Sequence, residues 1–197
     1  MNQKQALEFL RNNNGLHRTR DILNAGIAPK TLYKLRDQGH IYSLSRGLYR
    51  INEESKDAHT TYLELAHKIP KAVFCLISAL HFHEIGTQLP YDHWIALPQG
   101  VKEAKLDEYS IQYIHPNKEL YQLEIEEHNI SGATIKVYSP TKTVVDCFKH
   151  RNKVGLDVAL EALREAVQLK KTSRKELIEL ATKCRMRNVM MPYIESL

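Results

Sequence analysis

The sequence has few cysteines and no long hydrophobic run. Its three cysteines, Cys75, Cys147 and Cys184, are an odd number, lie far apart and stand in apolar stretches. This pattern excludes a disulfide framework and a zinc knuckle, and we expect reduced thiols in the core. No segment approaches the roughly 18 to 20 apolar residues of a membrane span, and residues 1–14 are too polar for a secretory signal. We therefore expect a cytoplasmic protein.

A glycine-rich phosphate loop, internal repeats and low-complexity tracts are also absent from the 197 residues. No nucleophile elbow and no familiar catalytic cysteine signature is present. The sequence therefore predicts a protein that is not an enzyme and has no cofactor. A hydrophobic content of 43% is ordinary for a globular chain, and this length suits one medium domain or two small ones.

Charge is distributed unevenly along the chain, whose net charge is +5. Residues 1–51 carry nine Lys/Arg and three Asp/Glu, a net charge of +6, whereas the other 146 residues carry nineteen and twenty, a net charge of −1. Such asymmetry predicts a polyanionic partner for the N-terminal segment and a different role for the rest.

Apolar periodicity predicts three short helices near the N-terminus, one over Gln3 to Asn13 and two more before residue 40. Thr19 is expected to cap the second helix, and Gly26 to end it. Pro29 suits the first turn of the third helix, which stops at Gly39. Two short helices joined by a turn containing glycine, after a supporting helix, are typical of a helix-turn-helix.

Two β-prone runs, 41–44 and 48–51, come after these helices and are joined by Ser45-Arg46-Gly47, which predicts a hairpin, or wing. A winged helix-turn-helix would place the third helix in the major groove of duplex DNA and Arg46 near phosphates or the minor groove. A protein-interaction module with solvated basic residues is the alternative. The expected DNA contacts are Lys30, Thr31, Tyr33, Lys34, Arg36 and Arg46.

The remaining sequence predicts a second domain, so that the chain as a whole is of the α+β class. The N-terminal domain is expected over 1–54, a polar linker near 52–57, and a larger α+β domain over 58–197. Residues 72–82 could form a buried strand, a helix, or one running into the other. We expect a helix over 58–68, strands over 94–97, 111–114, 123–130 and 133–138 in a small, mostly antiparallel sheet, and C-terminal helices from Pro140 onward, one with a Ser173-x-x-Glu176 capping box.

A histidine-rich segment raises the question of a metal site. His81, His83, Glu84 and His93 are close in sequence. Histidines two residues apart share a face on a strand but not on a helix, so metal binding is a minor hypothesis beside partly buried imidazoles.

Asp92 followed by Glu103-x-Lys105 has the spacing of a metal-dependent nuclease. Glu103 and Lys105 come after Pro98-Gln99-Gly100, however, and so belong to a loop rather than to the strand that such a site needs. A nuclease is therefore the weakest hypothesis.

Residues 138–153 combine an apolar face with many charged side chains. Lys142 and Asp146 are four residues apart, which predicts an ion pair on a solvated helix surface. A charged docking face for a protein is the alternative, and spacing alone favours neither.

Four stretches carry a resemblance to a known family: RGLYRI at 46–51, PKAVFCLISALHFHEIGTQLP at 70–90, WIALPQG at 94–100 and KVYSPTKTVVDCFKHRNKVGLDVALEALREA at 136–166. By these stretches the chain resembles, over nearly its whole length, the AbiEi family, the antitoxins of type IV toxin-antitoxin systems. It implies a winged-helix domain that binds repeats in the promoter of its own operon and represses transcription. It also implies a second domain that counteracts a nucleotidyltransferase-like toxin, without a stable complex in the general description of the family.

The resemblance assigns the DNA role to the six expected contacts on the third helix and the wing. Two winged helices on one repeat would come from a dimer or from monomers side by side, so we expect a monomer or homodimer. A stand-alone winged-helix factor that responds to a metabolite or metal is the alternative. An antitoxin role is placed on Lys142, Asp146, Lys149, Arg151 and Lys153.

Overall fold

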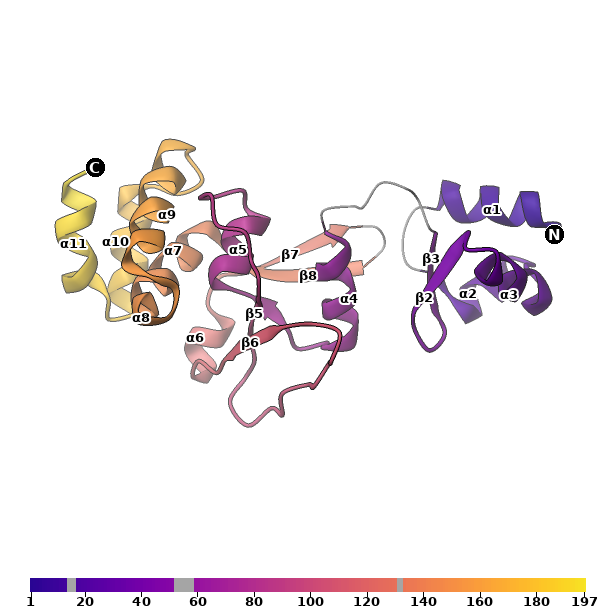
Figure 1. Ribbon diagram of the computed structural model, residues 1–197. Helices are drawn as coiled ribbons and strands as arrows, with labels where there is room; N and C mark the ends of the chain where they lie inside the picture. Colours follow the sequence, from indigo (N-terminus) through magenta and orange to yellow (C-terminus); the bar gives the residue numbers. More distant parts are fainter. Residues whose placement is uncertain (14–16, 52–58, 131–132) are drawn as a thin grey trace. The chain divides into compact units, whose positions relative to one another are not determined.

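The structure is a computed structural model that describes residues 1–13, 17–51, 59–130 and 133–197 (Figure 1). Cα packing divides the chain into unit 1, residues 1–70 with 128–135, and unit 2, residues 71–127 with 136–197. The expected linker, 52–57, and the expected domain boundaries at 54 and 58 lie outside the described residues. Within the described ranges, no helix is both long enough and apolar enough to cross a membrane.

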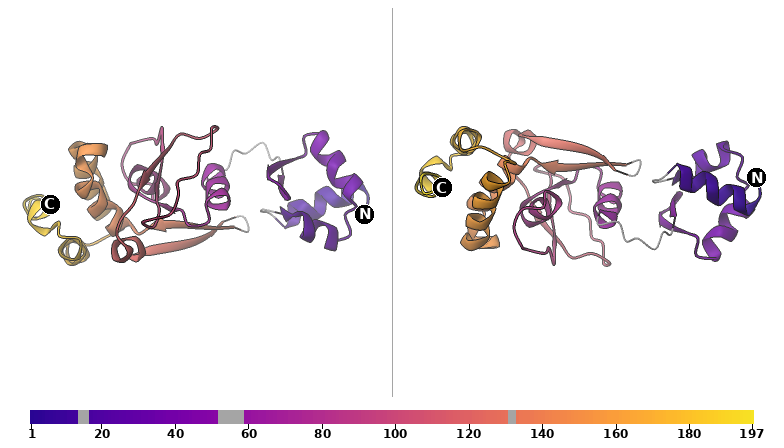
Figure 2. Two further views of the ribbon diagram at one scale, coloured as in Figure 1. Left: turned by 90° about the horizontal axis from the view of Figure 1, so that it is seen from below. Right: turned by 90° about the horizontal axis from the view of Figure 1, so that it is seen from above.

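The N-terminal module, residues 1–51, contains the three predicted helices and the predicted hairpin, gathered in one group in Figure 2. A short strand that the sequence did not predict, β1, precedes the second helix. It pairs with the hairpin to give an antiparallel sheet in the order β1-β3-β2. The elements are α1 (Gln3–Asn12), β1 (His17–Arg18), α2 (Thr19–Asn24), α3 (Pro29–Asp37), β2 (Ile41–Ser45) and β3 (Leu48–Ile51).

Helix α3 begins and ends where its sequence predicts. Pro29 stands in the first turn, where its missing N–H costs no hydrogen bond. The chain leaves α2 through Gly26 at φ +82° and leaves α3 through Gly39 at φ +76°, in the left-handed region that favours glycine. These two glycines set the bounds of the turn before α3 and the turn after it.

The predicted cap of α2 was wrong. Thr19 is the first residue of the helix rather than its cap, which is Arg18 without a side-chain hydrogen bond. The Thr19 hydroxyl instead donates to the carbonyl oxygen of Gly47 at 3.1 Å. This bond ties the start of α2 to the hairpin turn that carries Arg46.

A small hydrophobic core holds the N-terminal module together. Each helix and both hairpin strands contribute at least one side chain that is no more than 7% exposed, so the apolar periodicity in the sequence corresponds to one buried face per element. The core consists of Ala6, Leu10, Ile22, Ile27, Leu32, Leu35, Ile41 and Tyr49.

The rest of the chain contains both short strands and helices, and it ends in a series of helices that starts at Pro140, where the C-terminal helices are predicted. Its elements are α4 (Thr60–Lys68), β4 (Val73–Phe74), α5 (Leu76–Phe82), β5 (His93–Ala96), β6 (Ile111–Ile114), α6 (Lys118–Gln122), β7 (Ile125–Ile130), β8 (Ala133–Tyr138), α7 (Pro140–Lys149), α8 (Arg151–Val154), α9 (Leu156–Gln168), α10 (Arg174–Lys183) and α11 (Arg187–Glu195).

The five-stranded sheet is mixed, which corrects the prediction of a mostly antiparallel sheet. Its order is β6-β5-β4-β8-β7, with β4 antiparallel to β5 but parallel to β8, and β5 parallel to β6. The prediction failed because strand order depends on long connections that local sequence does not specify. Residues 72–82 form a strand that runs into a helix, the third of the three alternatives.

Helix α7 lies at the centre of the C-terminal helices and contacts α5, α9 and α10 (Figures 1 and 2). It begins at Pro140, and the hydroxyl of the preceding Ser139 accepts from the Lys142 amide at 3.1 Å. Ser173 and Glu176 form the predicted capping box at the start of α10. All eight residues from Thr141 to Phe148 are buried, so α7 is a core helix on every side.

Candidate functional site

Helix α3 presents a basic face opposite its buried face. Leu32 and Leu35 are at most 1% exposed and point into the core. With 3.6 residues per turn, Lys30, Tyr33 and Lys34 fall on the opposite side of the helix, and all three are exposed. These three predicted DNA contacts therefore form one surface.

Two more residues share this surface, and the sequence-based prediction missed both. Asp37 and Gln38 line an open hollow together with Lys30, Tyr33 and Lys34. Asp37 is one turn beyond the lysines, so the spacing that selected Lys30 and Lys34 could have found it. Its negative charge opposes DNA phosphates unless a cation neutralises it.

Arg36 supplies that cation. Its guanidinium donates to one Asp37 carboxylate oxygen from Nε at 3.0 Å and from Nη2 at 2.8 Å, and it lies over the Tyr33 ring at 5.2 Å. By contrast, no carboxylate within the described ranges lies within 4.0 Å of the Lys30 or Lys34 ammonium. The Arg36 charge is thus compensated by Asp37, whereas the positive charges of Lys30 and Lys34 are not compensated by a carboxylate.

The last two predicted contacts lie at different places. Thr31 is half-buried at the edge of the basic face. Arg46 is exposed in the turn between β2 and β3, where the hairpin places it away from the core. We refer to Lys30, Tyr33, Lys34 and Arg46 together as the basic surface.

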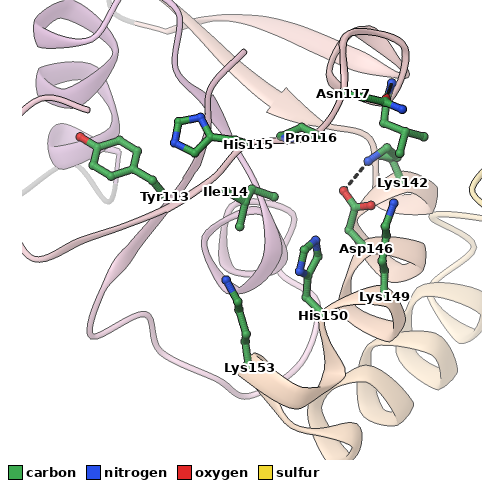
Figure 3. A pocket seen from close by; sticks show the side chains of 11 residues that line it. Tyr113, Ile114, His115, Pro116, Asn117, Lys142, Asp146, Lys149, His150 and Lys153 are labelled. Atoms are coloured by element: carbon green, nitrogen blue, oxygen red, sulfur yellow. Dashed lines mark hydrogen bonds and ion pairs between the residues drawn. The ribbon is translucent and has the colours of Figure 1, made fainter. Parts of the chain in front are cut away.

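A second charged site lies in the C-terminal part of the chain, around a cavity of about 430 Å³ (Figure 3). Its walls come from the end of β6 and the turn into α6 on one side and from α7 and α8 on the other. Figure 3 shows His150 and Lys153 projecting from the helices toward the strand that carries Tyr113 and Ile114. The lining residues are Tyr113, Ile114, His115, Pro116, Asn117, Leu120, Lys142, Asp146, Lys149, His150 and Lys153.

A buried ion pair forms part of this wall. Lys142 donates to Asp146, as the i, i+4 spacing predicts, but their side chains are 1% and 5% exposed. The predicted solvated surface pair was therefore wrong, and so was a docking face that includes these two residues. The Lys142 ammonium also lies 4.2 Å from the centroid of the Tyr138 ring, a cation–π contact.

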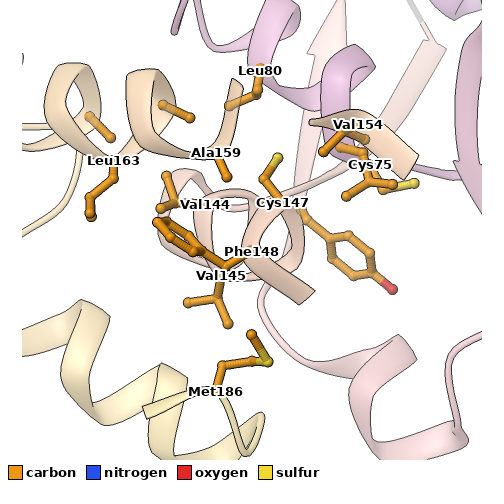
Figure 4. Close-up of a cluster of buried hydrophobic side chains, with 14 of the residues drawn as sticks. Cys75, Leu80, Val144, Val145, Cys147, Phe148, Val154, Ala159, Leu163 and Met186 are labelled. Atoms are coloured by element: carbon orange, nitrogen blue, oxygen red, sulfur yellow. The ribbon is translucent and has the colours of Figure 1, made fainter. Parts of the chain in front are cut away.

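The surroundings of α7 explain why these charges are buried. Its other side chains pack into the main hydrophobic core, where Figure 4 shows Val144, Val145, Cys147 and Phe148 facing neighbouring helices. Burial raises the pKa of the Cys147 thiol well above its ordinary value. Because the thiol rather than the thiolate predominates, Cys147 is an unreactive core residue, as its apolar context predicted.

The remaining charged residues of the segment divide into two groups. Lys149 and Lys153 are exposed and line the cavity, whereas Arg151 does not line it and donates to the Phe148 carbonyl at 2.9 Å. His150 lies between the two lysines and is half-buried. Burial is the main cause that lowers its pKa; the Asp146 carboxylate opposes this shift, and the nearby lysines lower the pKa further. The imidazole is therefore neutral at pH 7.

Among the described residues, the histidine-rich segment does not bring three possible metal ligands together. His81 and His83 lie at the end of α5, a helix, where side chains two residues apart diverge. His83 Nε2 is 2.7 Å from the Tyr138 carbonyl oxygen, and burial lowers the pKa of His93. Across the described part of the chain, no three His, Cys, Asp or Glu side chains gather as metal ligands would.

The hypothetical nuclease residues lie at opposite ends of the β5–β6 pair. Asp92 accepts from Ser110 at the start of these parallel strands, and Glu103 contacts His115 at their end, 3.0 Å away. Ser110 and His115 are five residues apart, which at about 3.3 Å per residue separates the two contacts by roughly 16 Å. Residue Lys105 falls outside any helix or strand, so these residues do not share one metal site.

The chain is similar to one family of regulators and to a solved structure. No curated protein matches the chain. The crystal structure of the RV2827C protein from Mycobacterium tuberculosis is similar in fold, with a TM-score of 0.57 and 13% identity over 90% of this chain and 69% of the other. The family described as "Transcriptional regulator, AbiEi antitoxin" matches residues 4–52, which include the RGLYRI stretch. This match confirms the resemblance to antitoxin transcriptional regulators over residues 4–52, about a quarter of the chain.

Proposed function

We propose that the chain is a winged helix-turn-helix repressor of its own operon and the antitoxin of a type IV toxin-antitoxin pair. The single observation that carries the proposal is that the family match and the positive charge fall in the same segment. The segment that matches a family of antitoxin transcriptional regulators, 4–52, is also the segment that holds the charge excess and the basic surface.

The geometry of α3 supports binding in the major groove. The exposed Lys30, Tyr33 and Lys34 lie on one side of a helix whose other side anchors it to a packed core, as in the second helix of a helix-turn-helix. Arg46, in the hairpin turn, would reach the adjacent phosphate backbone of the DNA. The Thr19 to Gly47 hydrogen bond would hold that turn in register with the helices. Thr31 and Arg36 contribute less directly, since Thr31 is half-buried and Arg36 is paired with Asp37.

DNA binding is tested with duplexes that carry the sequence upstream of the gene. We expect footprinting to protect a repeat in that sequence, and a promoter fusion to be repressed when the protein is supplied. Affinity should fall steeply with salt, because phosphate contacts release counterions. Equal affinity for the upstream duplex and for a shuffled duplex of the same composition would contradict a role as a specific repressor.

The antitoxin role belongs to the part of the chain beyond residue 52. Its partner would be a nucleotidyltransferase-like toxin encoded beside it, opposed without a stable complex. Lys149 and Lys153 are the exposed members of the segment that the family resemblance selects, and Arg151 is half-buried beside them. The protein would act in this role by binding rather than by catalysis.

The antitoxin role is tested by expressing the neighbouring reading frame with and without this chain. We expect growth arrest by the toxin alone and rescue by co-expression, with rescue retained in a Lys30→Ala, Lys34→Ala variant that no longer represses. Failure of the intact chain to rescue growth would remove the antitoxin role and leave the regulator role standing.

A further inference from the structure

We propose that the cavity between β6 and helices α7 and α8 is a binding site for the phosphate group of a small phosphorylated metabolite. The proposal rests on unit 2 alone and is independent of DNA binding by the N-terminal module. A volume of about 430 Å³ lies within the usual range for small-molecule sites.

The charges around the cavity favour an anion. Lys142 and Asp146 neutralise each other, which leaves Lys149 and Lys153 as two positive charges in excess. Neither of these ammonium groups has a carboxylate within 4.0 Å among the residues that the structure describes. A dianionic phosphate would compensate both.

The buried end of the cavity has an unused hydrogen-bond donor. A lysine ammonium has three N–H donors. Within the described ranges, Asp146 is the one hydrogen-bond acceptor of the Lys142 ammonium, and the Tyr138 ring covers another side of it. A fully buried cation normally uses its donors, because an unmet one costs free energy. A phosphate oxygen in the cavity would accept the remaining N–H.

Neutral groups on the walls suit a phosphate ester rather than a bare ion. The half-buried His150 imidazole, whose lowered pKa keeps it neutral, offers an N–H donor without adding charge. Tyr113 and Pro116 give the opposite wall a less polar surface for the organic part of the ligand. The hydroxyl of Tyr113 is already committed to the Ala104 carbonyl at 2.9 Å, so its ring is held in place.

The proposal is tested by NMR titration of the full chain, labelled with ¹⁵N, with inorganic phosphate as the probe and chloride at equal ionic strength as the reference. We expect saturable shifts of the His150 ring and of amides over 114–117 and 146–153. Shifts confined to residues 30–38, equal shifts with chloride, or no saturation would overturn the proposal.

Matched variants separate this site from general attraction to cationic surfaces. Lys149→Gln with Lys153→Gln should weaken phosphate binding at the cavity by at least about tenfold, since two charge-assisted hydrogen bonds are lost. Lys175→Gln with Lys183→Gln removes the same charge from exposed positions of α10 and should leave binding unchanged. Equal weakening by both pairs would show that the cavity is not the site.

A further titration distinguishes the sources of phosphate. Ribose 5-phosphate should shift the same resonances at lower concentration than inorganic phosphate, because its organic part contacts the Tyr113 wall. A short DNA duplex at equal phosphate concentration should shift residues of α3 and leave His150 unmoved. If the duplex alone moved His150, the cavity would be a nucleic-acid contact and the metabolite proposal would be wrong.

Discussion

The N-terminal module and helix α7 use lysine in opposite ways. On α3, Lys30 and Lys34 extend from the exposed side of a two-faced helix and have no acidic partner among the described residues. On α7, Lys142 lies within the core and is held by Asp146. The same residue type at helical spacing therefore provides an electrostatic surface in one place and a buried pair in the other. The number of neighbours packed around each helix decides which.

The largest effect that this comparison predicts comes from removing one half of the buried pair. Asp146→Ala leaves the Lys142 ammonium buried without a counter-ion, and we expect a loss of about 3–5 kcal/mol in the free energy of unfolding. Trp94, the only tryptophan, is 9% exposed in unit 2, so its fluorescence during urea denaturation reports the change. A loss below about 1 kcal/mol would contradict the buried pair.

Two control variants sharpen this result. Lys142→Met with Asp146→Leu removes both charges and should recover most of the stability, because no unpaired ion remains. Lys34→Ala on the exposed side of α3 should change the free energy of unfolding by no more than about 0.5 kcal/mol.

The next largest effect is on DNA binding. It concerns the difference between Lys30 and Lys34, which have no acidic partner among the described residues, and Arg36, which is paired with Asp37. Lys30→Ala and Lys34→Ala should each lower the slope of log affinity against log salt by about one unit if they contact phosphate, or cost about 1–3 kcal/mol at one base if they read its edge. Arg36→Ala with Asp37→Ala should cost less, because the two residues neutralise each other and removing both leaves the net charge of α3 unchanged. Fluorescence anisotropy over a salt series gives both quantities. A larger loss for the Arg36→Ala, Asp37→Ala variant than for Lys34→Ala would reverse the assignment.

A third prediction compares glycines at positive φ in the two regions. Gly155 has φ +97°, and an added Cβ would lie against the Asp157 carboxylate, whereas Gly26 has φ +82° and open space around it. We expect Gly155→Ala to cost about 2–3 kcal/mol and Gly26→Ala about 1 kcal/mol in the free energy of unfolding. Asp157→Ala should recover part of the first loss and none of the second. Equal costs, measured by urea denaturation, would show that backbone strain alone matters.

The smallest effect is the pH dependence of the N-terminal module. Burial lowers the pKa of His17 below 6.5, and its Nε2 is buried without a hydrogen-bond partner among the described residues. The unfolded chain then binds a proton before the folded one does. Stability should therefore fall as the pH decreases below about 6.5.

A His17 variant shows how much of the pH dependence of stability comes from the N-terminal module and how much from the rest of the chain. His17→Gln should flatten it for the transition followed by far-ultraviolet circular dichroism, and should leave the pH dependence of the Trp94 transition unchanged. The latter depends on His93 and His150, whose pKa values are also lowered by burial. If His17→Gln altered only the Trp94 transition, His17 would not be the group responsible.

The sequence predicted the N-terminal elements well because each depends on local signals. Pro29 and Gly39 bound α3, and Leu32 with Leu35 defines its buried side. Strand β1 was missed because two residues carry no periodic pattern, and its pairing with β3 joins residues far apart in sequence.

The second region was less predictable. The strand segments were mostly located correctly, yet their mixed order depends on crossover connections. The spacing of Lys142 and Asp146 predicted their pairing but not their burial, because lysine is seldom buried. His115 and His150 were not foreseen as neighbours in one cavity, since β6 and α7 are brought together only by the fold.

The central claim, that the basic surface binds duplex DNA, is tested most directly by mapping DNA-induced amide shifts on the ¹⁵N-labelled full chain. With a duplex from the upstream region, we expect the largest shifts over residues 30–38 and at Arg46, and their loss in the Lys30→Ala, Lys34→Ala variant. Shifts confined to residues 71–127 and 136–197, with α3 unmoved, would contradict it.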